Sequence, residues 1–395
     1  MNNKKRGAHL APKPRQGHHA DQTKDLEGAE QNPQGTKPRK KKRWTVLVIV
    51  VVVVVGILSA SYLIFRHFYK MMNYQPGTQS QTYTASDNTT EDDTAGATGT
   101  NSMSADQIQK LQNDLMANIQ ANAEQPVYDD NVYNILLMGT DVRESGESGR
   151  TDSMVLVSIN KDTKKIVLTS FLRDIYIYIP GYDGYQRLNA ANVFGGPDMT
   201  LNTIEQNFGV SVDKYAQVNF YAFIDIVDAL GGVDVDLSSA EISEMNKKMQ
   251  EVNWYIYKND AHLYDGNISG GAGNYHLNGA QALAYCRVRY VDSDFGRTER
   301  QRQVLEQLWS KVKTMPVLSA YQLMEKTFPN VTTNLTEGEC LGLLSSITQV
   351  LNYDVETVHV PQDGTYSNAT ISGMSVLSID MEKNKTAIHD AIYGN

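Results

Sequence analysis

An unusual concentration of arginine lies between Tyr285 and Gln303. The stretch contains the aspartates Asp292 and Asp294 and the arginines Arg287, Arg289, Arg297, Arg300 and Arg302. Guanidinium groups hold phosphate oxygens through paired hydrogen bonds, and the chain as a whole carries a formal net charge of −9, so the cluster predicts a local site for a phosphorylated ligand. The segment after a helix expected at 277–284 reads as extended, and its alternation places Arg287 and Arg289 on one side.

A second part of the cluster belongs to a helix expected at 297–312. Arg297 and Gln301 are four residues apart and are therefore neighbours on one face of that helix. Arg297 also falls in the first turn, where free backbone N–H groups and the helix dipole favour an anion. Arg300 and Arg302 are also compatible with solvated surface positions, and for Arg302 we favour that interpretation.

Carboxylates stand at the ends of expected strands, which is where open α/β sheets bind ligands. Asp141 comes just after a strand expected at 131–139, and Asp152 precedes the next one, two residues after Arg150. These carboxylates flank one loop and could meet at its mouth. Mg²⁺ usually binds through one or two carboxylates together with phosphate oxygens, so the pair suits a magnesium site. The alternative is that both residues only cap turns.

A third strand end carries the pair Arg173 and Asp174, shortly after a strand expected at 166–171. Such a pair is usually a structural ion pair. Because the neighbouring strand ends carry the same residue types, Arg173 is also a candidate for clamping phosphate.

Other chemistries find little support in the sequence. It contains no Walker A loop, His-Glu-x-x-His, Gly-x-Ser-x-Gly or Cys-x-x-Cys motif, which argues against nucleotide hydrolysis, zinc peptidase and serine hydrolase activity. Asp234 and Asp236 alternate along an expected strand and so face one side, where a solvated or structural role fits best. Cys286 and Cys340 fit simple burial, and a bridge between them stays open in an oxidising exterior.

Residues 44–65 contain no charge and are mostly Val, Leu and Ile. A bilayer core of about 30 Å needs roughly 20 apolar residues in a helix, so this run predicts one membrane span rather than a cleavable signal peptide. Residues 1–43 hold twelve Lys or Arg and four Asp or Glu, whereas only Arg66 and Lys70 follow closely, so we expect a cytoplasmic N-terminus and an extracellular domain at the cell membrane. A polybasic block next to a span is a topology signal, so we expect no nucleic-acid partner.

The rest of the chain divides by composition. Residues 1–43 are polar and basic and read as a disordered cytoplasmic tail. Residues 66–126 read as an extracellular linker with one short helix at about 105–122, capped by Ser104. A catalytic domain is expected over residues 127–395.

Within this domain, apolar runs of strand length alternate with helical patterns. Strands are expected at 131–139, 153–159, 166–171, 175–179, 215–218, 233–237 and 355–360. Helices are expected at 199–208, 220–230, 240–252, 277–284, 297–312 and 340–351. This order predicts an α/β fold, a three-layer α-β-α sandwich with a central mixed sheet, preceded by one N-terminal transmembrane helix.

Five ordered blocks between Val132 and Gln303 resemble the LytR-CpsA-Psr family of Gram-positive cell-envelope enzymes. The blocks are NILLMGTD at 134–141, GRTD at 149–152, LRD at 172–174, VDALGGV at 227–233, and residues 277–289 followed by DFGRTERQ at 294–301. A single span with an external domain is also the family's usual arrangement. Leu172 is a departure, because the family commonly has Pro at this position.

The resemblance implies a phosphotransferase that moves an anionic glycopolymer, such as wall teichoic acid or capsular polysaccharide, from a polyprenyl diphosphate carrier to peptidoglycan. It implies that Asp141 and Asp152 hold Mg²⁺. It further implies that Asp294 orients the arginines or accepts a proton from the acceptor hydroxyl. The remaining site residues would bind the diphosphate and stabilise the charge of the leaving phosphate: Arg150, Arg173, Arg287, Arg289, Arg297 and Gln301.

A lipid carrier also requires an apolar groove. The candidates for its wall are Val218, Phe220, Phe223, Ile224 and Val227, with core packing as the alternative for each. Two other functions stay open from the sequence: a polyprenyl-diphosphate hydrolase that uses the same groups to activate water, and a noncatalytic polymer-binding or regulatory protein.

Overall fold

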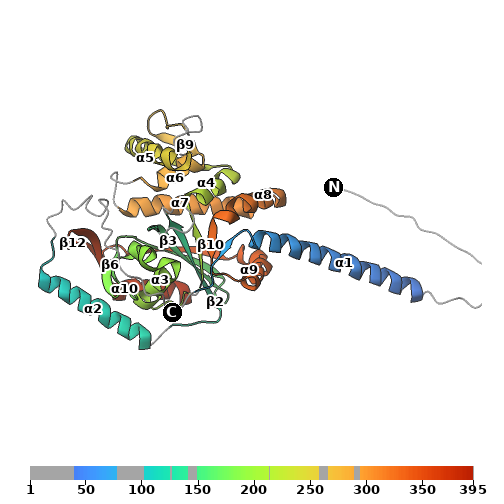
Figure 1. Ribbon diagram of the computed structural model, residues 1–395, viewed down its shortest axis with the longest axis horizontal. Helices are drawn as coiled ribbons and strands as arrows, with labels where there is room; N and C mark the ends of the chain where they lie inside the picture. The colour runs from blue at the N-terminus through green and yellow to red at the C-terminus, as the bar shows by residue number, and fades with distance from the viewer. Residues whose placement is uncertain are drawn as a thin grey trace, which may run out of the picture. The chain divides into compact units, whose positions relative to one another are not determined.

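The computed structural model describes residues 40–77, 102–124, 127–140, 149–212, 214–257, 266–288 and 294–394 (Figure 1). The chain forms two compact units, Met1–Ser59 and Ala60–Asn395, and helix α1 (Lys40–Tyr69) belongs to both. Among the described residues, one helical stretch is long and apolar enough to cross a membrane, Val50–Tyr69 with a mean hydropathy of 2.0. It overlaps the predicted span and continues beyond it.

A mixed sheet of seven strands lies at the centre of the second unit, in the order β1, β10, β7, β2, β3, β4, β11. Its strands are β1 (Asn73–Tyr74), β10 (Val331–Thr333), β7 (Lys214–Val218), β2 (Val132–Thr140), β3 (Thr151–Asn160), β4 (Lys165–Phe171) and β11 (Asp354–Val360). β2, β3 and β4 are antiparallel neighbours, and β7 and β11 add in parallel on the two sides. Alternation along β2 turns Leu136 and Met138 to one face and Ile135 and Leu137 to the other.

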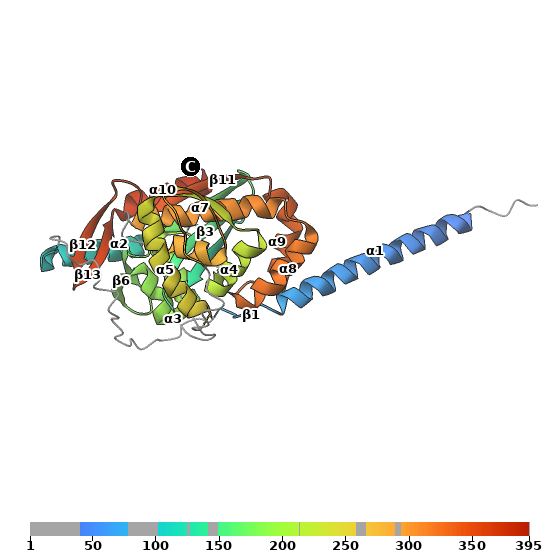
Figure 2. The ribbon, with the colours of Figure 1, turned by 90° about the horizontal axis from the view of Figure 1, so that it is seen from above.

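Two helices cover the first face of the sheet, and a third packs outside them (Figures 1 and 2). They are α3 (Ala191–Phe208), α10 (Met381–Tyr393) and the outer α2 (Ala105–Glu124). Ile204 of α3 and Ile388 of α10 are buried in one core with Leu136 of β2. Two hairpins add to this core: β5 (Tyr176–Ile179) with β6 (Gly184–Arg187), and β12 (Tyr366–Ile371) with β13 (Met374–Ile379).

The opposite face of the sheet contacts α7 (Asp294–Lys313) and α9 (Glu337–Val350), where Trp309 and Leu343 pack near Ile166. A second core lies on the far side of α7 (Figure 1). It is built from α4 (Phe220–Ala229), β8 (Val233–Leu237), α5 (Ser239–Tyr257), β9 (Gly273–Leu277), α6 (Gly279–Cys286) and part of α7, and α8 (Val317–Thr327) contacts α4. Helices on both faces of a mixed sheet confirm the predicted fold class.

Most expected strands and helices are present within a few residues of their predicted bounds, but three segments differ. Residues 175–179 do not continue the strand before them: Ile175 bridges to Leu377, and Tyr176–Ile179 form β5, which pairs with β6. The sequence pattern predicts a helix from Leu277, whereas pairing with Val233 makes this residue the end of β9. The predicted linker begins too early, because α1 extends to Tyr69 and β1 then joins the sheet.

Candidate active site

Asp152 occupies a β-bulge at the end of the β2–β3 pair. Ser153 pairs with Gly139 and Thr151 pairs with Thr140, so Asp152 is the extra residue between the two pairs. A bulge bends the strand and redirects the side chain of its extra residue. Here Asp152 Oδ1 accepts a hydrogen bond of 2.9 Å from Arg173 Nη1. The bulge therefore brings two of the predicted strand ends into direct contact.

Arg173 is part of a buried chain of alternating charges at the end of β4. Its Nε lies 3.3 Å from Asp174 Oδ2, and Arg187 Nη1 lies 3.2 Å from Asp174 Oδ1. None of these three side chains is more than 10% exposed. The backbone N–H of Leu377 in β13 donates to Asp174 O and holds the segment in place. The series Arg187, Asp174, Arg173, Asp152 thus fixes the Arg173 guanidinium where the strands end.

The electrostatics of the site keep both carboxylates ionised. Burial raises the pKa of the Asp152 carboxyl, but three nearby guanidinium groups outweigh burial and hold the pKa below its ordinary value. These groups belong to Arg173, Arg297 and Arg287. The pKa of Asp174 is lowered in the same way, against burial, by its own neighbouring arginines. Among the described side chains, more guanidinium groups than carboxylates converge here, which leaves net positive charge for an anionic ligand.

Arg287 reaches the site from the second core, at the C-terminal end of α6. Gly279 in the first turn of α6 allows close contact with α4, since a Cβ there would lie 2.4 Å from Ile224 O. The Arg287 guanidinium lies 5.0 Å from the centre of the Phe220 ring, and its Nη2 is 3.2 Å from Glu251 Oε2. Its Nη1 is buried and makes no hydrogen bond within the described residues. Arg287 Nη1 is therefore a buried hydrogen-bond donor at the site that no described residue uses.

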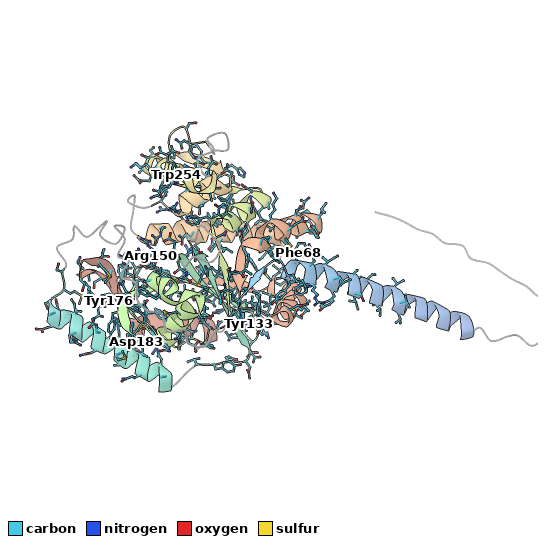
Figure 3. All side chains as sticks on the ribbon, viewed as in Figure 1. Phe68, Tyr133, Arg150, Tyr176, Asp183 and Trp254 are labelled. Carbon is cyan, nitrogen blue, oxygen red and sulfur yellow. The ribbon has the colours of Figure 1, made fainter. Side chains whose placement is uncertain are left out.

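The extended segment predicted after α6 is absent at Arg287. This residue caps the helix with a φ of −102° and a ψ of 0°, a turn in which strand alternation does not apply. Arg289 and Asp141 lie outside the described residues, and so does the side chain of Asp294. Arg150 is half-buried next to the start of β3 (Figure 3). Only part of the predicted ligand set is thus brought together by described side chains.

Helix α7 contributes one arginine to the site and uses another for structure. Arg297 is 3% exposed and close enough to lower the pKa of Asp152. Gln301 Nε2 lies 3.4 Å from a backbone carbonyl oxygen of α6, so it ties the two helices together. Arg300 is not solvated, because it is 2% exposed and forms an ion pair of 3.2 Å with Glu241. Arg302 is half-buried and not simply solvated: its side chain is 35% exposed, pairs with Glu299 and donates a hydrogen bond of 3.1 Å to Thr357 Oγ1.

The fit to a metal ion rests on Asp152. Within the described part of the chain, no cluster of three or more His, Cys, Asp or Glu side chains could hold a metal. Magnesium requires fewer, because water and phosphate oxygens complete its shell. The Asp152 side chain is 26% exposed and ionised, and its Oδ1 accepts the hydrogen bond from Arg173. Asp174 does not fit, because each of its oxygens is paired with an arginine.

The face of the sheet next to Asp152 carries apolar side chains that are not fully buried. Leu137 is 37% exposed although its strand has neighbours on both sides, so this part of the sheet is not fully covered. Val218 of β7 lies on the same face and pairs with Gly139. Val218 and Phe223 are half-buried and stay candidates for the wall of a groove. The other three candidates are buried in the second core, so packing is their role: Phe220, Ile224 and Val227.

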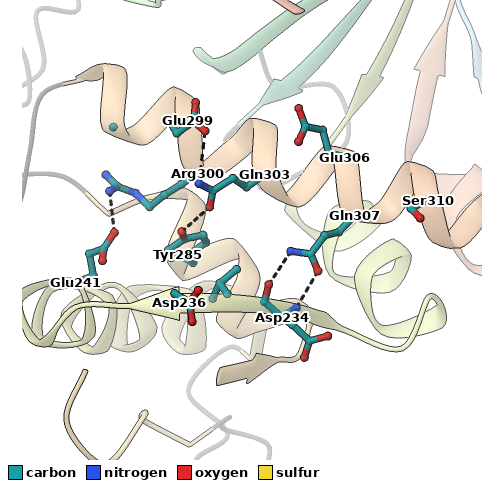
Figure 4. Close-up of a pocket in the computed structure, with 12 residues that line it drawn as sticks. Asp234, Asp236, Glu241, Tyr285, Glu299, Arg300, Gln303, Glu306, Gln307 and Ser310 are labelled. Atoms are coloured by element: carbon teal, nitrogen blue, oxygen red, sulfur yellow. Dashed lines mark hydrogen bonds and ion pairs between the residues drawn. The ribbon is translucent and has the colours of Figure 1, made fainter. Parts of the chain in front are cut away.

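A hollow of about 620 Å³ between β8 and α7 has the wrong charge for a phosphate (Figure 4). Carboxylates dominate its polar lining, which includes Asp234, Asp236, Glu241, Glu299 and Glu306. Its single described arginine, Arg300, is already paired. The exposure of both aspartates of β8 agrees with the solvated role predicted for them.

Comparison with known proteins matches residues 88–389 to the LytR_cpsA_psr family. The chain belongs to the LytR_cpsA_psr family. A polyisoprenyl-teichoic acid–peptidoglycan teichoic acid transferase, TagU of Bacillus cereus, is 35% identical over 233 residues, which are 58% of this chain and 69% of that protein. TagT of Bacillus subtilis, whose name gives the same activity, is 33% identical over 241 residues, 58% of this chain and 70% of the relative.

Solved structures of LytR_cpsA_psr proteins agree in fold. A structure described as TagT bound to LIIa-WTA has a TM-score of 0.53 and 27% identity, and covers 68% of this chain and 92% of that chain. The crystal structure of Bacillus subtilis TagT has a TM-score of 0.52 and 27% identity, and covers 68% of this chain and 94% of that chain. The family resemblance predicted from the five sequence blocks is confirmed.

Two features of this LytR_cpsA_psr site escape sequence reasoning. Arg187 has no local signal, since the β5–β6 hairpin alone brings it to Asp174. Glu251 is likewise paired with Arg287 only through the packing of α5 on α6.

Leu172, where the family commonly has proline, donates its N–H to Val360 O at 2.9 Å, a bond that proline could not form.

Proposed function

We propose that this LytR_cpsA_psr protein is a membrane-anchored transferase that moves an anionic glycopolymer, such as a teichoic acid, from a polyisoprenyl diphosphate carrier to peptidoglycan. One observation carries the proposal: the buried Arg173 and Arg297 and the half-buried Arg287 lie around Asp152, next to a sheet face that carries the apolar side chains of Leu137 and Val218. A lipid diphosphate presents the matching pair of chemistries, an anionic head and an apolar tail. The names of the relatives supply the polymer class and the acceptor.

The reaction exchanges the phosphoanhydride bond of the carrier diphosphate for a phosphate ester bond to the acceptor. The acceptor hydroxyl oxygen attacks the phosphorus that carries the glycopolymer, the bond to the bridging oxygen breaks, and the lipid monophosphate leaves. Such transfers depend mainly on positioning and on neutralisation of charge. Arg173, Arg287 and Arg297 supply that positive charge, with Arg150 and Arg289 as further phosphate ligands. Because the charge series fixes Arg173 in advance, little reorganisation is needed when charge develops on the leaving group.

The acceptor proton requires a base other than the two buried aspartates. The lowered pKa values of Asp152 and Asp174 make both carboxylates weak bases near neutral pH. Asp152 is better suited to hold a cation, so we assign it to Mg²⁺ together with Asp141. Bound magnesium would neutralise the diphosphate. Asp294 is the candidate for receiving the proton or orienting the arginines.

The apolar part of α1 before Arg66 anchors the protein in the membrane once. The basic residues before it place the N-terminus in the cytoplasm and the catalytic domain outside. Protease added to intact cells is expected to digest the domain and to leave residues 1–43 protected. If the domain were protected from the protease instead, the orientation would be opposite to the one proposed.

The proposal is tested with the full chain in phospholipid nanodiscs that contain a polyprenyl-diphosphate saccharide. Mg²⁺ and peptidoglycan chains are added, and label joined to peptidoglycan is measured. The wild type is expected to transfer the label. Asp152→Ala and Arg287→Ala are expected to lose transfer at least 100-fold, which corresponds to about 2.7 kcal/mol of transition-state stabilisation. Arg302→Ala, on the surface of the same α7, is the matched control and should retain it.

The possible outcomes separate the candidate functions. Phosphate release without transfer would replace the proposal with a hydrolase. Binding of the lipid without any turnover would point to a polymer-binding or regulatory protein. Equal activity with and without a metal chelator would remove magnesium from the scheme and leave the transferase in place.

A further inference from the structure

The helices α8 and α9 present large apolar side chains to solvent. Leu318 of α8 is 70% exposed, and Leu344 and Ile347 of α9 are 55% and 38% exposed. Figures 1 and 2 both show α8 and α9 at the end of the domain that carries the last turns of α1. Several exposed apolar side chains in one region indicate an interaction site. Leu318, Leu344 and Ile347 are called the α8–α9 surface below.

Residues 60–69 of α1 are tied directly to both helices. Tyr62 Oη donates a hydrogen bond of 2.9 Å to Glu337 Oε1 in the first residue of α9. Phe68 is 2% exposed, and its ring centre lies 4.7 Å from that of Tyr321 in α8. Strand β1 follows at once and pairs with β10. The end of α1 is therefore part of the domain and is not separated from it by a linker.

Helical spacing extends these contacts to the α8–α9 surface. Leu318 precedes Tyr321 by three residues, so it lies on the side of α8 that contacts Phe68. Leu344 follows Glu337 by seven residues, which is about two turns, so it lies on the side of α9 that faces Tyr62. The exposed leucines thus share the sides of α8 and α9 to which the end of α1 is bound.

The position of Tyr62 gives the depth of this surface. Tyr62 lies four residues before Arg66, near the end of the uncharged run 44–65, and tyrosine is favoured at the membrane–water interface. Its partner Glu337 must lie at nearly the same depth, so the start of α9 lies at the level of the lipid head groups. From there we infer that the α8–α9 surface docks on the phospholipid bilayer and seats the catalytic domain against it. The inference rests on the span, and it does not require the proposed transfer reaction.

Docking would hold the arginine site at a fixed height above the membrane. A carrier whose tail stays in the bilayer could then reach the site without the domain having to find it by diffusion. If the proposed function holds, docking gives the membrane a second role: besides anchoring the protein, it aligns the enzyme with its lipid substrate.

The test measures depth in the full chain reconstituted at one copy per phospholipid nanodisc. In a Cys340→Ser background, a nitroxide is attached to Leu318→Cys, Leu344→Cys or, as the matched control, Trp254→Cys. Trp254 is also a large exposed side chain, at 57%, but it lies in α5 of the other core (Figure 3). Collision rates with lipid-soluble oxygen and with a water-soluble nickel chelate are compared.

Labels at positions 318 and 344 are expected to collide several-fold more with oxygen than with the nickel chelate, and the label at 254 should show the reverse. Nickel access at 318 and 344 equal to that at 254 would overturn the inference. If the labels at 318 and 344 were protected from the nickel chelate only in discs that hold two copies, the inference would also be overturned, in favour of contact between copies of the chain.

A charge variant gives a second readout. Leu318→Glu with Leu344→Glu should raise nickel access of a label at Ile347→Cys several-fold, whereas Trp254→Glu should leave it unchanged. Both leucines are exposed, so an unchanged melting temperature is expected and shows that the fold is intact. If the wild type transfers no label at all, the proposed function fails, while the depth measurement still decides on docking.

Discussion

Removal of Arg187 tests whether the buried charge series holds the active site together. In Arg187→Gln, Asp174 Oδ1 loses its partner while the carboxylate stays buried, with only 10% of the side chain exposed. Breaking a buried pair typically costs about 3–5 kcal/mol, and here Asp174 would keep its ion pair with Arg173 but lose the compensation that Arg187 supplies. For a domain of this size, roughly 2–4 °C are lost per kcal/mol, so the melting temperature should fall by about 6–20 °C. Arg302→Gln, with its partly exposed surface pairs, should stay within about 1 kcal/mol of the wild type.

The assay is unfolding of the full chain in detergent, followed by tryptophan fluorescence, for Arg187→Gln, Asp174→Asn and the double variant. Residues in one ion-pair network usually show a coupling energy of about 0.5–3 kcal/mol, and here we expect the upper half of that range. Binding of inorganic pyrophosphate should weaken together with stability, because Asp174 also positions Arg173. Effects of the two single variants that add within about 0.5 kcal/mol would refute the idea of one connected series.

Three further results are expected. Glu251→Gln removes the carboxylate beside Arg287 and should tighten pyrophosphate binding about 2- to 5-fold at low salt, a modest gain because Glu251 is 39% exposed. The control Glu241→Gln should lower stability without tightening the binding of pyrophosphate. Weaker binding in Glu251→Gln would contradict the pairing of Glu251 with Arg287. Because the pKa of Asp152 is lowered in the folded state, the Asp152 carboxylate contributes fully to stability above about pH 4, and this contribution is lost as the pH falls further. The stability of Asp152→Asn should therefore lack this part of the pH dependence in acid unfolding. Gly279→Ala should lower the melting temperature and slow transfer, because the added Cβ would meet the α4 backbone at 2.4 Å. If the variant melted at the same temperature as the wild type, α6 would have to move aside to make room for the methyl group.

The sequence already contained the local part of this architecture. Runs of β-branched and apolar residues predicted β2, β3, β4 and β11 within one or two residues, because alternation of side chains is a property of the strand itself. The capped helix α2 was predicted from the helical spacing of its apolar residues and from its N-cap, since Ser104 accepts from the Gln107 N–H in the first turn. Elements whose stability comes from distant partners were missed, such as the β12–β13 hairpin and α10.

Within the candidate site, the sequence by itself determined which residue types were available and at which strand ends they stood. Only the tertiary structure decided their partners: the bulge that turns Asp152 to Arg173, the hairpin that brings Arg187 to Asp174, and the burial that makes Arg300 structural. Spacing along one helix or strand is fixed by local backbone geometry. Ion pairs between elements depend instead on how those elements pack, and that packing is set by apolar contacts spread over the whole chain.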